Sequence, residues 1–158
     1  MVVLLRAVED LDLDIFFAQQ LDPEANRMAA FTSPNPADRH AFDARWSRIR
    51  RDESSLARTI VADGEVAGCI MRWRDPELPG PEVTYWLGRE HWGRGIATAA
   101  LERFLELASQ RPLFGRCAAD NAGSRRVLEK NGFLVEREDR GFSNARGQEI
   151  AELILRLA

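Results

Sequence analysis

The chain has 158 residues, of which 45% are hydrophobic and 30% are charged, and its formal net charge is −3. This length and composition predict one globular domain, residues 1–158, around one core, and no apolar run approaches the roughly 20 residues that would span a membrane. The acidic balance argues against general nucleic-acid binding, which needs a basic surface.

The first third of the chain predicts one strand and two helices. Val2–Ala7 is apolar and β-branched, which is typical of a strand. Acidic residues then open a helix near Asp10, where they favour the positive end of the helix dipole. Pro23 interrupts this helix, and an irregular connection is expected over residues 26–36. A second helix is expected over residues 37–51.

The outer face of that second helix is rich in arginine. Four arginines fall within the seven residues from Arg45 to Arg51. We interpret this row as a solvated helix face, and the alternative is a docking patch for an acidic partner.

A hairpin follows, made of strands over Leu56–Ala62 and Val66–Trp73. The residues between them, Asp63-Gly64, predict a tight turn, because both centres of a type I′ turn need positive φ. The loop Arg74–Pro81 contains three prolines and leads into a strand at Glu82–Leu87. Side chains of this strand alternate between two faces, which places Glu82 and Tyr85 on opposite sides.

The second half of the chain alternates helices and strands. A helix is expected over Ile96–Gln110, with Leu107 on its buried face. The next strand, Leu113–Ala119, should run parallel to Glu82–Leu87 across this right-handed crossover.

A short helix over Ser124–Asn131 follows, and Gly132 closes it as a C-terminal glycine. Two closing strands are expected at Leu134–Glu138 and Gln148–Leu157, with Gly141–Gly147 as the loop between them.

Gly93 and Gly95 lie in the turn between the strand at 82–87 and the helix that starts at Ile96. Amides in the first turn of a helix have no intrahelical partner, and the helix dipole favours an anion there. Glycine lets a ligand approach the backbone closely, and Arg94 adds a positive charge. The turn therefore predicts a site for a phosphate-bearing cofactor.

Two familiar glycine loops do not fit this turn. The nucleoside-triphosphate loop needs a lysine after its last glycine, and none is present. The dinucleotide fingerprint needs a small residue where Thr98 stands, and an opening βαβ unit where a hairpin is expected.

A third loop fits better. Trp92-Gly93-Arg94-Gly95-Ile96-Ala97 resembles the pyrophosphate loop of the GCN5-related N-acetyltransferases (GNATs), with Trp92 where glutamine or arginine is usual. The segment from Asn121 to Phe133 resembles the second signature of this family. The sequence around the loop is similar to the branch that acetylates the N-terminal alanines of ribosomal proteins. The resemblance covers most of the chain and is weakest before Leu56.

This resemblance implies an α/β (α+β) fold with a mixed, splayed sheet of about seven strands and about four helices. It also implies acetyl transfer from acetyl-CoA to an amine by direct attack, with the pantetheine between the strands at 82–87 and 113–119. The acceptor could be a protein N-terminus, an aminoglycoside, a polyamine or an amino acid. We expect a cytoplasmic monomer or homodimer with no nucleic-acid or membrane partner.

The same resemblance assigns the cofactor-binding residues to the strand end, the glycine turn and the start of the later helix. They are Trp86, Leu87, Gly88, Trp92, Gly93, Arg94, Gly95, Ile96, Ala97, Asn121 and Ser124. The alternative for Trp86 and Trp92 is core packing, and for Asn121 a turn between strand and helix.

The candidate base is Glu82, and its alternative is a strand-edge carboxylate that faces solvent. Many family members donate a proton from a tyrosine at the position of Leu128, which has no proton to give. Ser124 is the candidate donor instead, although it could simply cap its helix. Tyr85 is a further donor.

Because this tyrosine is missing, the alternative function is a non-catalytic CoA-binding module. Cys117 could carry an acyl group, but its apolar strand argues against this; Cys69 and Cys117 are expected to be reduced core residues. His91 is expected on the surface. With two histidines and no spacing of metal ligands, no metal site is expected.

Overall fold

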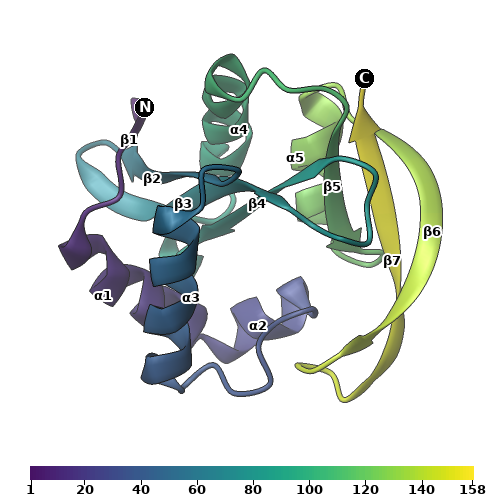
Figure 1. Cartoon of the computed structure of the whole chain (residues 1–158), viewed down its shortest axis with the longest axis horizontal. Coiled ribbons are helices and arrows are strands. Elements are labelled where there is room, and N and C mark those ends of the chain that lie inside the picture. The colour runs from purple at the N-terminus through teal and green to yellow at the C-terminus, as the bar shows by residue number, and fades with distance from the viewer.

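One mixed sheet runs through the molecule, and the computed structural model describes it over all residues, 1–158 (Figure 1). Its strand order is β1-β2-β3-β4-β5-β7-β6. The strands are β1 (Val3–Arg6), β2 (Leu56–Ala62), β3 (Glu65–Arg74), β4 (Pro81–Leu87), β5 (Leu113–Ala118), β6 (Leu134–Ser143) and β7 (Gln148–Leu157). The helices are α1 (Asp10–Gln20), α2 (Pro23–Ala29), α3 (Arg39–Arg51), α4 (Ile96–Leu107) and α5 (Ala122–Lys130), with a 3₁₀ turn at Arg89–His91.

The sheet is antiparallel except between β4 and β5. These two strands run parallel, and the register joins them only at Glu82 and Phe114. Beyond this pair they separate, as their ribbons show in Figure 1. The expected splayed, mixed sheet is therefore confirmed, and the gap between β4 and β5 lies in its middle.

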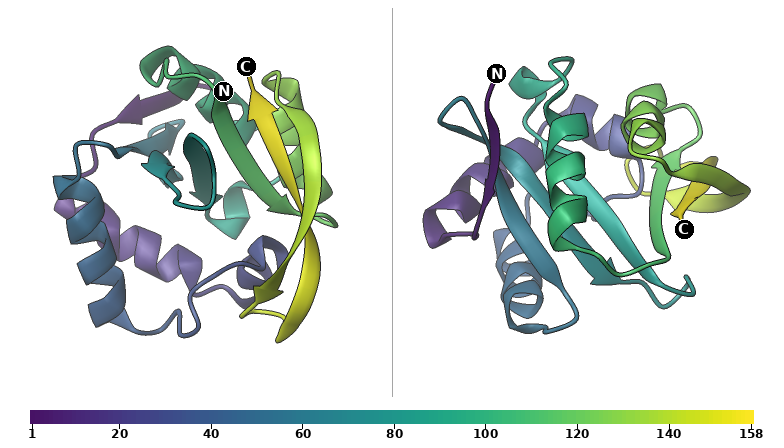
Figure 2. Two further views of the ribbon diagram at one scale, coloured as in Figure 1. Left: turned by 45° about the vertical axis from the view of Figure 1, so that its right-hand side comes forward. Right: turned by 90° about the horizontal axis from the view of Figure 1, so that it is seen from above.

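Helices cover both faces of the sheet. The helices α4 and α5 pack on one face, and α1 and α3 pack on the other, over β2 and β3 (Figure 2). The main core lies on the α4 side and includes Ile96, Leu101 and Phe104, each almost fully buried. A smaller cluster on the α1 and α3 side includes Phe16 and Trp46.

Several local predictions are confirmed. Asp63 and Gly64 have φ values of 49° and 83°, as the type I′ turn between β2 and β3 requires. Gly132 has φ of 90°, and the amide of Phe133 donates to the carbonyl oxygen of Leu128 at the end of α5. This pattern is the expected glycine stop of a helix.

The structure has one helix more than the sequence predicted. Pro23 begins α2, whereas we expected it to interrupt a helix and an irregular chain to follow. Proline is well suited to the first turn, where its missing N–H has no partner to lose. The Asp22 side chain caps the same turn by accepting from the amide of Glu24.

Two predicted boundaries were wrong. The helix that begins at Ile96 ends at Leu107, and the Leu107 side chain is 51% exposed rather than buried. The strand β6 continues to Ser143, so the loop predicted at 141–147 is reduced to a turn after Ser143. Pairing with β7 extends β6 this far, a long-range effect that local sequence does not encode. No helix is both long and apolar enough to cross a membrane.

Candidate active site

A cavity of about 550 Å³ occupies the place where β4 and β5 separate. Its walls come from β4, from the turn before α4, from β5 and α5, and from α2 on the opposite face of the sheet. Side chains from both faces therefore line one continuous space. Most of the predicted cofactor-binding residues line it: Trp86, Leu87, Trp92, Gly93, Gly95, Ile96, Ala97, Asn121 and Ser124.

The glycine turn forms one end of this cavity. Gly93 and Gly95 have φ values of 72° and 78°, and no atom lies within 4 Å of where a Cβ would be. The amides of residues 96–98 have no acceptor in the chain, because the first backbone bond of α4 is from Ala99 to Gly95. Open space beside free amides at a helix N-terminus is an environment that suits an anion.

Two predicted cofactor-binding residues lie outside the lining. Gly88 packs against the side chain of Gln19, which leaves no room for a Cβ. The Arg94 guanidinium points to Asp63, with Nη2 3.6 Å from Oδ2. Trp92 lies in the lining, and its indole Nε1 donates to the carbonyl oxygen of Leu87 over 3.2 Å, which ties the turn to β4.

Asn121 begins α5 and joins it to α2. Its Oδ1 accepts from the amide of Ser124 at 3.2 Å, and its Nδ2 donates to the carbonyl oxygen of Met28 at 3.2 Å. Because Asn121 is the cap, the alternative in which the Ser124 hydroxyl caps the helix is wrong.

The Ser124 hydroxyl instead meets Tyr85. The two hydroxyl oxygens are 2.8 Å apart, and Tyr85 Oη is also 3.1 Å from the carbonyl oxygen of Ser124. Burial raises the pKa of Tyr85, so its proton stays on the phenol. At the position where the resemblance expects a tyrosine, Leu128 is buried against Gly115. The strand β4 thus supplies a phenolic hydroxyl, which the leucine at position 128 does not.

A cluster of charged residues lies near the cavity on the other face of β4. Arg116 contacts four carboxylates, which we call the acid ring: Asp75, Glu77, Glu82 and Glu152. Arg116 Nη1 is 3.1 Å from Glu77 and 3.5 Å from Glu152, and its Nε is 3.4 Å from Glu82. Arg116 also lines the cavity, so it connects the ring to that space.

Glu82 is the most perturbed member of the ring. It is only 5% exposed, so the alternative of a solvent-facing carboxylate is wrong. Burial, reinforced by the nearby charges of Glu152 and Glu77, raises its pKa to about 8. A carboxyl group with this pKa can accept and release a proton near neutral pH. It lies on the face of β4 opposite Tyr85, as the strand alternation predicted.

Two further residues line the cavity. His91 is 4% exposed, so the prediction of a surface histidine was wrong. Cys117 is buried, and burial raises the pKa of its thiol to about 11. The thiol therefore stays protonated at neutral pH, which makes it a poor nucleophile.

Sequence reasoning missed most of the acid ring. Arg116 and Glu152 are charged residues within apolar strands, and that pattern was the available signal. Asp75 and Glu77 lie in a loop rich in proline, where charges are common. Nothing in their local sequence marks them as partners of Arg116.

Comparison with known proteins identifies the family. The model of the acetyltransferase (GNAT) domain matches residues 3–134. The chain is 32% identical over 111 residues to the putative ribosomal N-acetyltransferase YdaF of Bacillus subtilis strain 168, an alignment that covers 66% of this chain and 61% of YdaF. It is 33% identical over 82 residues to the ribosomal-protein-serine acetyltransferase of Escherichia coli K12, covering 49% and 46% of the two chains. The matches thus span less than two thirds of either relative.

The fold is also similar to that of solved structures. Spermidine N-acetyltransferase from Vibrio cholerae, solved in complex with CoA and spermine, superposes with a TM-score of 0.79 at 18% identity. That superposition covers 98% of this chain and 95% of the other. At this identity the likeness establishes the fold.

Proposed function

The chain belongs to the GNAT acetyltransferase family, and we propose that it transfers an acetyl group from acetyl-CoA to a primary amine. The observation that carries this proposal is the cavity between β4 and β5. One end has the glycine turn with its free amides, the middle has the Tyr85–Ser124 pair, and the opposite face has the acid ring around Arg116. We propose that residues 1–158 act as one catalytic domain.

The residues present fit the donor substrate. The amides at 96–98 and the open space at Gly93 and Gly95 would hold the diphosphate of acetyl-CoA. The pantetheine arm would lie between β4 and β5, where the edge of β4 beyond Glu82 has no strand partner. Asn121 uses both ends of its side-chain amide within the chain, so we assign it the role of positioning α5 rather than binding the arm.

The proposed reaction is direct attack of the amine on the thioester. The amine nitrogen forms a bond to the acetyl carbon, and the bond from that carbon to sulfur breaks. Glu82, directly or through a water, accepts the proton that the amine loses. The leaving thiolate takes a proton from the Tyr85–Ser124 pair. Cys117 carries no acyl group in this scheme, because its raised pKa keeps it a neutral thiol.

The acid ring suits a positively charged acceptor. Four carboxylates against one guanidinium leave a charge of −3 when all are ionised. An amine arrives largely protonated, since an α-amine titrates near pH 8 and a lysine near 10.4. The ring would attract this cation, which becomes the attacking amine by releasing one proton to solvent.

The proposal needs no nucleic-acid partner, in keeping with the net charge of −3.

Isothermal titration and a turnover assay test the proposal. We expect acetyl-CoA to bind with a micromolar Kd and ATP not to bind, because the turn lacks the lysine of a nucleoside-triphosphate loop. Release of CoA should then depend on added amine. Binding of ATP in place of acetyl-CoA would overturn the assignment. Tight acetyl-CoA binding without turnover of any amine would favour the non-catalytic module, which the hydroxyl supplied by Tyr85 disfavours.

A further inference from the structure

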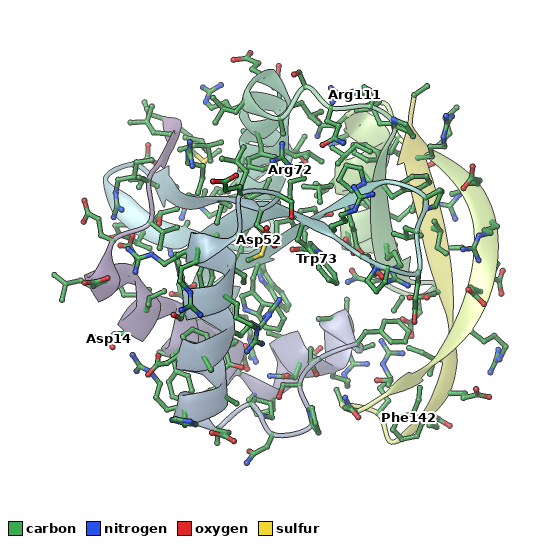
Figure 3. The ribbon with its side chains drawn as sticks, in the orientation of Figure 1. Asp14, Asp52, Arg72, Trp73, Arg111 and Phe142 are labelled. Carbon is green, nitrogen blue, oxygen red and sulfur yellow. The ribbon has the colours of Figure 1, made fainter.

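The C-terminal half of α3 and the adjacent end of β3 enclose a second hollow, of about 540 Å³. Four exposed arginines line it, together with Trp73; we call it the arginine hollow. The arginines are Arg45, Arg48, Arg51 and Arg74. Figure 3 labels Trp73 and Asp52, which both line the hollow near the C-terminal end of α3.

The charge of this hollow is not balanced within the chain. Other arginines on α3 are paired: Arg39 with Asp14 and Asp43, and Arg50 with Asp10. None of the four arginines of the hollow makes an ion pair. The one carboxylate in the lining, Asp52, accepts instead from the amide and hydroxyl of Ser54.

Trp73 lines the same hollow. Its indole Nε1 is buried and has no acceptor in the chain. The hollow thus combines four unpaired cationic groups with an indole wall, and cationic groups without partners favour an anionic occupant.

The arginine hollow lies beside the acid ring. Trp73 and Glu82 are directly opposed in the register of β3 and β4. Residues opposed in an antiparallel pair point to the same face, with Cβ atoms about 5 Å apart. The next residue after Arg74 is Asp75, a member of the acid ring. A negative and a positive site therefore adjoin on one face of the sheet.

We infer that the acceptor is a polypeptide N-terminus followed by acidic residues, with its amine at the acid ring and its acidic side chains in the arginine hollow. This inference rests on the proposed function. An extended chain advances about 3.3 Å per residue, so residues 3 to 6 of an extended peptide lie about 7 to 17 Å from its first residue. The alternative anion is a nucleic acid, which the single hollow and the net charge of −3 disfavour.

Matched peptides test this inference. Three peptides share one N-terminal residue and carry glutamate, glutamine or lysine at positions 3 to 6. We expect kcat/KM at low salt to be about tenfold higher for the glutamate peptide than for the glutamine peptide, since several exposed ion pairs each contribute modestly. The preference should shrink as salt is raised. Equal rates for the glutamate and glutamine peptides would overturn the inference.

Substitutions on α3 test whether the preference for the glutamate peptide arises in the arginine hollow. The double variant Arg45→Gln/Arg48→Gln should lose the preference for the glutamate peptide and keep its rate with a small amine such as spermidine. Arg50→Gln, on the same helix but paired with Asp10, is the matched control and should keep the preference. A preference that survives in the double variant would contradict the assignment of the hollow.

Equilibrium binding separates this inference from the proposed function. If acetyl-CoA is bound but no amine is turned over, fluorescence anisotropy of the labelled peptides still measures their affinity for the acetyl-CoA complex. We expect the glutamate peptide to bind about tenfold tighter than the glutamine peptide, and the double variant to lose this difference. This result would support the assignment of the arginine hollow even if no amine were acetylated. Tighter binding of a single-stranded RNA of similar length would overturn it in favour of nucleic acid.

Discussion

The hydroxyl oxygen of Tyr85 on β4 lies 2.8 Å from that of Ser124 on α5, so a hydrogen bond joins the two elements across the cavity. Either oxygen could be the donor. In the proposed reaction, a proton that one hydroxyl gives to the leaving thiolate can therefore be replaced from the other.

Removing either hydroxyl should slow proton transfer to the thiolate. We expect Ser124→Ala and Tyr85→Phe each to lower kcat by roughly 10²-fold, the lower end for general acid catalysis, with little change in the Kd of acetyl-CoA. If the two act as one relay, the double variant should lose little more than either single variant. If the losses of kcat in the two single variants multiply in the double variant, the two hydroxyls act independently. An unchanged kcat in Ser124→Ala would remove Ser124 from proton transfer.

The raised pKa of Glu82 predicts a pH dependence of the rate. A base works only when ionised, so kcat at saturating amine should rise with pH and level off above about 8. Glu82→Gln should abolish this rise and lower kcat by roughly 10²-fold. A pH profile that keeps its midpoint in Glu82→Gln would exclude Glu82 as the base.

A substitution at Glu77 tests the pKa of Glu82 without removing the Glu82 carboxylate. Its negative charge is one cause of the raised pKa of Glu82, and its side chain is 75% exposed. We expect Glu77→Gln to move the midpoint of the kcat profile to lower pH, because one repulsive charge is gone, and to leave the plateau rate intact. A midpoint that moves upward would contradict this account of the acid ring.

Gly95 should matter for cofactor binding beyond its effect on stability. Its φ of 78° strains any other residue, so Gly95→Ala should cost about 1 kcal/mol of unfolding free energy. The new methyl group would also enter the open space beside the free amides and raise the Kd of acetyl-CoA. Gly64→Ala is the matched control, because Gly64 has φ of 83°, equally open surroundings and no place in the cavity lining. It should lose similar stability, measured by urea unfolding, and bind acetyl-CoA normally.

Asp12 should contribute to stability in a pH-dependent way. Burial tends to raise its pKa, but bonds from Arg6, the amide of Glu9 and the Thr59 hydroxyl outweigh this and hold it at about 2. Because the folded pKa lies below the unfolded value of 3.8, this stability is present above about pH 4 and is lost as pH falls toward 2. Asp12→Asn should cost about 2 kcal/mol at pH 7 by urea unfolding. Asp14→Asn, which breaks an exposed pair, should cost less than about 1 kcal/mol.

Features set by neighbouring residues could be read from the sequence. The turn at Asp63-Gly64, the stop at Gly132 and the glycine turn before α4 depend on φ preferences and on bonds within a few residues. The parallel pairing of β4 and β5 also followed, because crossover connections have one preferred hand.

Tertiary structure alone decided which side chains meet. The acid ring draws its members from a loop, from β4 and from β7, and gathers them around Arg116 of β5, so its assembly depends on strand order and register. The pairing of Tyr85 with Ser124 likewise depends on how α5 packs beside β4. Local sequence determines turns and periodicity because those interactions span a few residues, whereas contacts between distant segments exist only once the sheet has formed.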